Sequence, residues 1–220
     1  MSAPKGTALI TGASSGIGAV YADRLTERGY DLILVARNEQ RLSEIAKRLE
    51  PSGRRIETIA ADLTKREDVQ RVADRLSSDS TITTLVNNAG LGTARKLLDE
   101  NIDDLESMIY LNVTALTRLA LAAIPGFVAR RNGLLINIAS VVALAPDLLN
   151  GTYSGTKAYV VNFTQALKNE VQGMGISVQA VLPGATATPL WDKSGRPVED
   201  LPAEIVMTAE DMVDGSLAGS

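Results

Sequence analysis

The stretch Thr7-Ala-Leu-Ile-Thr-Gly-Ala-Ser-Ser-Gly-Ile-Gly18 decides how this chain folds. Residues 7–10 are apolar or β-favouring and predict a buried strand. Glycines follow at Gly12, Gly16 and Gly18, and small or apolar residues then recur at a helical spacing. A strand, a Gly-rich turn and a helix form a phosphate cradle, because glycine lets the backbone approach an anion and the first helical N–H groups point at it. The spacing differs from the commoner Gly-x-Gly-x-x-Gly, so the stretch by itself also fits a turn without a ligand.

Strand and helix patterns alternate along almost the whole chain. Apolar runs predict strands at residues 31–36, 55–60, 83–86, 134–139 and 176–182. Amphipathic patterns predict helices at 39–50, 65–76, within 105–129 with an end near Pro125, at 153–171, and a helix-like stretch at 210–218. Strands separated by helices form a parallel sheet covered on both faces. We therefore predict one α/β domain over residues 1–220, with a doubly wound parallel sheet of six or seven strands and helices on both faces.

Composition excludes several kinds of chemistry. The chain has 220 residues, no cysteine, no histidine and a net charge of −4. Without a basic stripe, nucleic acid is not expected as a partner. Proton transfer near neutral pH has to use Tyr, Lys, Asp, Glu or water. A metal site would need oxygen ligands alone, and no acidic cluster points to one, so no metal is expected.

The chain carries no segment that predicts export or membrane insertion. Residues 1–6 lack the long apolar core of a signal peptide. No apolar run approaches the roughly 20 residues that span a bilayer. We therefore expect a cytoplasmic protein without a membrane partner.

Arg37 follows the second predicted strand, where a dinucleotide site often has an acidic residue that binds the ribose 2′-OH. Here the candidates are Ala36 and Arg37, so no carboxylate repels a phosphate, and a guanidinium can bind one through two hydrogen bonds. This favours NADP over NAD. Arg41 would lie nearby if the helix has begun. The alternative is a pair of solvated arginines.

Two further strand ends carry polar residues. Asp62 could accept a hydrogen bond from an adenine amino group, or it could cap the next helix in competition with Thr64. The turn Asn87-Asn88-Ala89-Gly90 could lie against a nucleoside or be an ordinary loop.

Tyr153 and Lys157 are four residues apart on a predicted helix and so share a face. An ammonium close to a phenol favours the phenolate and lowers its pKa, which makes a general acid/base. Ser140 follows the fifth predicted strand and can donate a hydrogen bond to a carbonyl oxygen. Tyr and Lys at this spacing also occur by chance on helix surfaces.

Asn112 lies inside the long apolar helix, where asparagine is unfavourable. It is either a satisfied core residue or the site of a local helix break that holds a water leading to Lys157.

Together these motifs resemble the short-chain dehydrogenase/reductase family. The resemblance rests on Thr11-Gly12-x-x-x-Gly16-Ile17-Gly18, Asn87–Gly90, Asn112, Ser140, Tyr153-x-x-x-Lys157 and Pro183-Gly184, in this order. It covers residues 5 to about 190 and implies a Rossmann-like domain. Family members of this type usually continue further and end with another strand, so the last edge of the sheet is expected to be missing.

The resemblance also implies roles. Tyr153 would be the proton donor or acceptor, Lys157 would lower its pKa and bind the nicotinamide ribose, Ser140 would polarise the substrate oxygen, and Asn112 would hold a relay water. The implied cofactor-binding residues are Gly12, Ser14, Ser15, Gly16, Ile17 and Gly18 for the phosphates and ribose, Arg37 for the 2′-phosphate, Asp62 and Leu63 for adenine, Asn88, Ala89 and Gly90 for the adenosine side, Tyr153 and Lys157, and Pro183, Gly184, Thr186 and Thr188 for the nicotinamide.

The expected function is therefore an NADP(H)-dependent oxidoreductase that interconverts a small-molecule carbonyl compound and an alcohol, with NAD(H) as the less favoured coenzyme. The alternative is a non-catalytic NADP-binding sensor or structural subunit. The segment at about 185–210 and residues 141–149, with Leu144, Leu149 and Trp191, would form an apolar substrate wall or pack on the protein itself. Because the helix near residues 109–124 is apolar almost all round, a homodimer or homotetramer is expected, as the family resemblance also implies.

Overall fold

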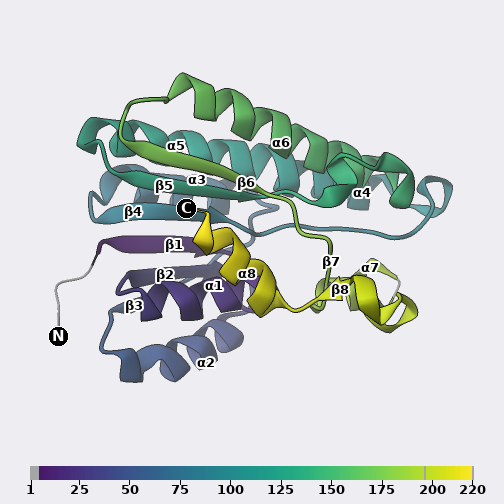
Figure 1. The fold of residues 1–220 in the computed structure, drawn as a ribbon, viewed down its shortest axis with the longest axis horizontal. Coiled ribbons are helices and arrows are strands. Elements are labelled where there is room, and N and C mark those ends of the chain that lie inside the picture. The colour runs from purple at the N-terminus through teal and green to yellow at the C-terminus, as the bar shows by residue number, and fades with distance from the viewer. Residues whose placement is uncertain (1–4, 196, 220) are drawn as a thin grey trace.

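A six-stranded parallel sheet forms the centre of the computed structural model, which describes residues 5–195 and 197–219. The strand order is β3-β2-β1-β4-β5-β6, and Figure 1 shows the strand arrows pointing toward the side where β7, α7 and β8 lie. The strands are β1 (Thr7–Thr11), β2 (Asp31–Ala36), β3 (Ile56–Ala60), β4 (Ile82–Asn87), β5 (Gly133–Ile138) and β6 (Ile176–Val181). The predicted doubly wound α/β fold with six strands is confirmed.

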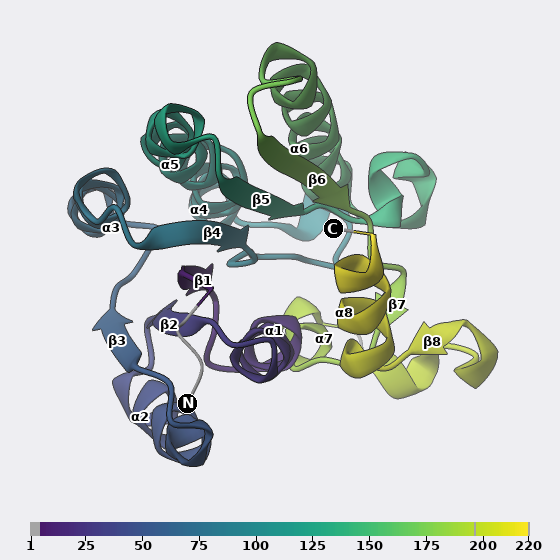
Figure 2. The same ribbon diagram turned by 60° about the vertical axis from the view of Figure 1, so that its left-hand side comes forward.

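The side chains of each strand point alternately to the two faces of the sheet, and the apolar ones form a core on each face. In β1, Leu9 packs into one core, whereas Ala8 and Ile10 pack into the other. Successive side chains of a strand point to opposite faces, so a run of apolar residues serves both cores. Figure 2 shows the two helical layers on either side of the sheet. One layer holds α3 (Arg66–Ser78), α5 (Leu116–Arg130) and α6 (Gly151–Glu170), and the other holds α1 (Gly16–Glu27), α2 (Glu39–Leu49) and α8 (Ala209–Ala218).

The long helix before β5 differs from its prediction. It consists of α4 (Ile102–Ile109), a π-helical segment over Tyr110–Ala115, and α5. The predicted end near Pro125 is wrong, because Pro125 lies inside α5 and the helix continues to Arg130. Proline removes one backbone donor, and the packing of α5 on α3 and the sheet compensates for that loss.

The prediction that no apolar segment reaches a membrane-spanning length also needs correction. The continuous helix Ile102–Arg130 is long and apolar enough by length and composition, with a mean hydropathy of 1.5 in its most apolar window. Half of that window is buried against the rest of the protein, as in a core helix that covers a sheet.

The chain after β6 forms a small subdomain. β7 (Ala185–Thr186) and β8 (Val206–Met207) make a separate two-stranded parallel pair, and α7 (Leu190–Ser194) lies between them. Neither strand was predicted, since a two-residue strand has no periodicity to detect.

Candidate active site

A cavity of about 800 Å³ opens at the carboxyl ends of the strands, where ligands bind in open α/β sheets. It collects nearly all of the predicted site residues, although they come from segments far apart in the sequence. The predicted residues that line it are Gly12, Ser14, Ser15, Gly16, Ile17, Arg37, Asp62, Leu63, Asn88, Ala89, Gly90, Ser140, Tyr153, Lys157, Pro183, Gly184, Thr186 and Thr188. Gly18 and Asn112 do not line it, and both act from behind its wall.

Glycine is required at each of these three positions of the first turn, for physical reasons that differ between them. Gly12 and Gly16 adopt positive φ angles of 66° and 52°, which other residues rarely tolerate. A Cβ atom at Gly18 would lie 2.3 Å from the carbonyl oxygen of Gly12. Gly18 therefore allows α1 to approach the turn closely, although it does not itself line the cavity.

The N-terminus of α1 is suited to an anion. The N-cap residue Ser15 makes no capping hydrogen bond with its side chain, and the first turn contains no acidic residue. By contrast, the N-cap side chains Asn38 of α2 and Thr208 of α8 accept hydrogen bonds from their helices, and both helices have acidic residues in the first turn. The first N–H groups of α1, beside a glycine turn that lines the cavity, fit a dinucleotide pyrophosphate.

The turn after β4 is bound tightly to the glycine turn. Asn88 Nδ2 donates to the carbonyl oxygens of Thr11 at 2.9 Å and Gly12 at 3.2 Å. Thr11 Oγ1 accepts from the backbone N–H groups of Asn88 and Ala89, each at 3.0 Å. The side chain of Asn88 thus holds two cavity walls together.

Positive charge gathers where β2 ends. Arg37, Asn38 and Arg41 all line the cavity, and Asn38 caps α2 by accepting from the backbone N–H of Arg41. Asn38 was not predicted as a site residue, although an Asn before an amphipathic helix is an N-cap signal. Because α2 begins at Glu39, Arg41 lies in its first turn, as the sequence predicted.

Asp62 forms a local turn beside these arginines. Its Oδ1 accepts from the backbone N–H and the hydroxyl of Thr64, at 3.1 and 2.8 Å. Burial alone would raise the pKa of the Asp62 carboxyl, but the bonds from Thr64 and the charge of Arg37 hold that pKa below 3.8. Asp62 is not the N-cap of α3, whose N-cap residue is Lys65.

Tyr153 lies almost fully buried against the cavity, with Ser140 as its neighbour. Burial raises the pKa of the Tyr153 phenol above its ordinary 10.0, and hydrogen bonding with the Ser140 side chain opposes part of that rise. The expectation of a lowered pKa is therefore wrong for this structure. Desolvation of the phenolate outweighs the hydrogen bond with Ser140.

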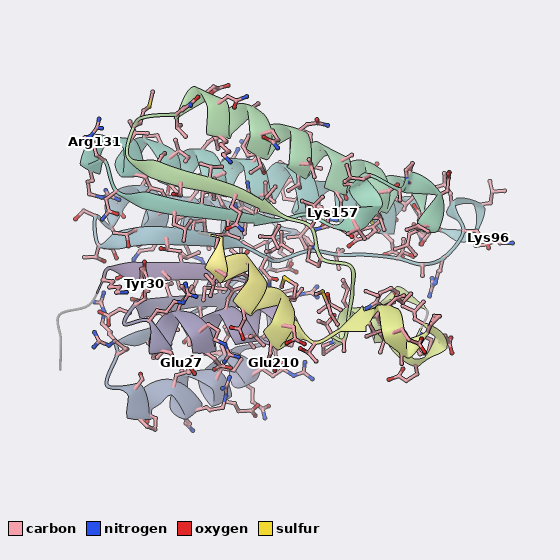
Figure 3. All side chains as sticks on the ribbon, viewed as in Figure 1. Glu27, Tyr30, Lys96, Arg131, Lys157 and Glu210 are labelled. Atoms are coloured by element: carbon pink, nitrogen blue, oxygen red, sulfur yellow. The ribbon has the colours of Figure 1, made fainter. Side chains whose placement is uncertain are left out.

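Lys157 projects from α6 into the interior, and Figure 3 shows it beside the strand ends, whereas Lys96 stands at an outer tip of the molecule. Its Nζ donates to the backbone carbonyl of Ile138 at 2.9 Å and lies 5.8 Å from the centroid of the Tyr153 ring. Burial lowers the pKa of Lys157 from 10.5 to about 8. The Tyr153–Lys157 pair is thus a buried pair, not the surface pair that the spacing also allowed.

Asn112 occupies the π-helical segment, so the predicted local helix break is present. Its Oδ1 accepts from the backbone N–H of Leu91 at 2.9 Å, and its Nδ2 donates to Leu91 O and to Thr156 Oγ1 at 2.8 and 3.1 Å. Both amide hydrogens are engaged in these bonds. The side chain therefore ties the loop after β4 to α6, and both Asn112 Oδ1 and Lys157 Nζ border Gly90, at 3.2 and 3.6 Å from the position of a Cβ there.

Apolar residues form the outer part of the cavity, including Val142, Leu149 and Trp191. The predicted wall residue Leu144 does not line the cavity and is 73% exposed. Leu91 and Gly92 also line it and were missed, because nothing in their residue type distinguishes them from an ordinary loop. No cluster of three or more acidic side chains suited to a metal ion occurs in the described part of the chain.

A glycine turn that fits a pyrophosphate, and a buried Tyr-Lys pair beside a serine, define a dinucleotide-dependent oxidoreductase site. The family profile described as short chain dehydrogenase matches residues 6–198. The chain therefore belongs to the short-chain dehydrogenase/reductase family, as the sequence motifs indicated. It is an enzyme of the class that interconverts CH–OH and C=O groups with a nicotinamide dinucleotide.

Solved structures and curated relatives resemble it over nearly its full length. A short-chain dehydrogenase from Sphingobium yanoikuyae in complex with NADPH is 46% identical, with a TM-score of 0.94, covering 97% of this chain and 83% of that one. A bulky-bulky ketone specific alcohol dehydrogenase from Comamonas testosteroni is 42% identical, with a TM-score of 0.89, covering 97% and 82%. The 17-beta-hydroxysteroid dehydrogenase type 3 of Danio rerio is 33% identical over 218 residues, 96% of this chain and 68% of the relative.

Proposed function

We propose that this enzyme is an NADP(H)-preferring carbonyl reductase and alcohol dehydrogenase in which Tyr153 is the general acid and base. The observation that carries the proposal is the convergence of Ser140, Tyr153 and Lys157 on one cavity with the glycine turn of β1. Each strand of the six-stranded sheet is followed within two positions by a residue that lines this cavity. We therefore treat residues 1–220 as one cofactor-binding domain, with residues 185–210 contributing to the substrate wall.

When bound in this cavity, a nicotinamide dinucleotide would supply the hydride for reduction of the carbonyl carbon, or accept it in the reverse direction. The raised pKa of Tyr153 keeps its phenol protonated, so it donates the proton to the carbonyl oxygen during reduction. Ser140 donates a second hydrogen bond to that oxygen and stabilises its developing charge. Lys157, held by the carbonyl of Ile138, places a cation beside the ring when the phenol gives up its proton.

The preference for NADP rests on Arg37 and Arg41 at the rim of the cavity. The two arginines offer charged donors to a 2′-phosphate, and Arg guanidinium groups bind phosphate through paired hydrogen bonds. Asp62 is the acidic residue that lines the same end of the cavity, and its Oδ1 already accepts hydrogen bonds from the backbone N–H and the hydroxyl of Thr64. The NADPH in the Sphingobium relative supports the same coenzyme here.

The test is a Tyr153→Phe variant, assayed by NADPH consumption with a panel of aldehydes and ketones. We expect kcat/KM to fall by at least about 100-fold, because a positioned general acid contributes on that scale. NADPH binding, followed by fluorescence titration, should remain. Tyr30→Phe is the matched control, because Tyr30 lines a different, smaller cavity. Normal turnover by Tyr153→Phe would remove the phenol from the mechanism.

We also propose that the enzyme is a homodimer or homotetramer that associates through α5 and α6. Leu121 of α5 and Tyr159 of α6 are exposed, and Tyr159 stacks on Phe163 with ring centroids 5.9 Å apart. Thr117 of α5 and Tyr159 of α6 are joined by a hydrogen bond of 3.0 Å, so the exposed apolar side chains of the two helices lie on the same side of the molecule. Sedimentation at micromolar concentration should show a dimer or larger species, and Leu121→Asp should reduce it to monomer. A wild-type monomer would contradict the proposal.

A further inference from the structure

The cavity has two ends with different chemistry. At the cofactor end, the charged side chains of Arg37, Arg41 and Asp62 line it. Beyond Tyr153, the described lining residues are apolar or small; they are Leu91, Gly92, Val141, Val142, Leu148, Leu149, Ala185, Leu190, Trp191, Leu201 and Ile205. At the end beyond Tyr153, therefore, none of the described lining residues offers a charged side chain that could pair with a charged group of the substrate.

One apolar wall belongs to the core around the tyrosine. Tyr153 and Val142 form a buried cluster with Leu105 and Met108, and Leu149 packs against it. A wall that is part of a packed cluster keeps its shape, because core side chains are held in defined rotamers. Leu149 therefore offers a fixed apolar surface beside the phenol.

A second apolar wall comes from a different part of the chain, the subdomain after β6. Trp191 Nε1 donates to the backbone carbonyl of Thr186 at 2.9 Å, and this bond fixes the indole next to the segment Pro183–Thr186. Leu201 and Ile205 extend the same wall. An indole whose single donor is already used presents only its apolar surface to a ligand.

The mouth of the cavity is apolar as well. The lining residues Leu148 and Ile205 are 63% and 59% exposed, one on each wall. Large apolar side chains that are exposed at the rim of a cavity mark a surface that gains from being covered. A substrate that reaches from Tyr153 toward both walls would cover them.

We propose that the substrate is a ketone with an apolar group of several carbon atoms on each side of the carbonyl, one group against each wall, with Trp191 setting the second wall. The inference rests on the proposed function, because it uses the same site. An uncharged substrate follows from the apolar lining: a carboxylate or phosphate placed there would lose its hydration without a partner. Burial of two apolar groups supplies the binding free energy.

The experiment measures NADPH consumption with three carbonyl compounds. Isopentyl phenyl ketone carries two apolar groups, benzoylpropionate has a carboxylate in place of the isopropyl end, and propanal is a small reference. We expect kcat/KM for the apolar ketone to exceed that for benzoylpropionate by about 10-fold or more. If propanal is turned over and kcat/KM for benzoylpropionate equals or exceeds that for isopentyl phenyl ketone, this inference alone is overturned. Turnover of no carbonyl compound, with NADPH bound, would overturn the proposed function and the inference with it.

Variants test the two walls separately. Leu149→Ala and Trp191→Ala should each lower the kcat/KM ratio of isopentyl phenyl ketone to propanal by about 10-fold, because apolar contact area is lost. Trp191→Phe keeps most of that area and should lower it less. Leu144→Ala is the matched control, since Leu144 is exposed and does not line the cavity. An equal effect in Leu144→Ala, or none in both wall variants, would overturn the assignment of the walls.

Discussion

Replacing Lys157 with methionine tests the charge that the fold buries beside Tyr153. Lys157 is only 6% exposed, and its ammonium group donates a hydrogen bond to the carbonyl oxygen of Ile138. Methionine has a similar length and no charge. It also leaves the Ile138 oxygen without this donor, which costs about 1–3 kcal/mol at every pH. The pH dependence of the difference between the two proteins therefore isolates the ionisation of Lys157.

The structure sets the size and sign of this dependence. Burial lowers the pKa of Lys157 from 10.5 to about 8, a gap worth about 3 kcal/mol, since one pKa unit corresponds to about 1.4 kcal/mol. Between these values the unfolded chain binds the proton and the folded chain does not, so the free energy of unfolding rises with pH. The destabilisation is present in full below about pH 8 and is lost as the pH approaches 10.5.

The assay is urea unfolding of the cofactor-free wild type and Lys157→Met, followed by circular dichroism at pH 7, 8, 9 and about 10. We expect the wild type to gain about 2.5 kcal/mol relative to the variant between pH 7 and pH 10. Ionisation of the tyrosines that are remote from Lys157 affects both proteins and cancels in the difference. Parallel stability curves for the two proteins would refute the reasoning, because they would mean that folding leaves the pKa of Lys157 unchanged.

Two further variants test the cofactor end. Arg37→Ala should weaken NADPH binding by about 10-fold to 100-fold and leave NADH binding nearly unchanged, because a charge-assisted hydrogen bond contributes about 1.5–3 kcal/mol. Fluorescence titration measures the binding of both coenzymes, and Lys47→Ala on the exposed face of α2 is the control. Equal losses of affinity for both coenzymes would count against recognition of the 2′-phosphate. Gly18→Ala should lower the free energy of unfolding by about 2–3 kcal/mol, because its methyl group would meet the carbonyl oxygen of Gly12 at 2.3 Å. Gly155→Ala in α6, where a Cβ meets nothing within 4 Å, should instead stabilise by up to about 1 kcal/mol, and equal stability of the two variants in urea would contradict the packing argument.

The sequence was sufficient for the sheet and for the place of the site. Strand and helix periodicities are local, so the six strands appeared within one or two residues of their observed bounds. Parallel strands bring their carboxyl ends to one edge, and this rule alone gathered Gly12, Arg37, Asp62 and Ser140 at one cavity. Neither inference required a contact between distant side chains.

The properties that depend on distant contacts came only from the tertiary structure. The i,i+4 spacing placed Tyr153 beside Lys157, but burial among Val142 and its neighbours, which no spacing encodes, raises the pKa of the phenol. Asn112 was a suspected helix break, yet its partners Leu91 and Thr156 lie 21 and 44 residues away in the chain. Backbone hydrogen bonding within a few residues sets the elements, whereas desolvation and side-chain partnership depend on what the whole fold packs around each group.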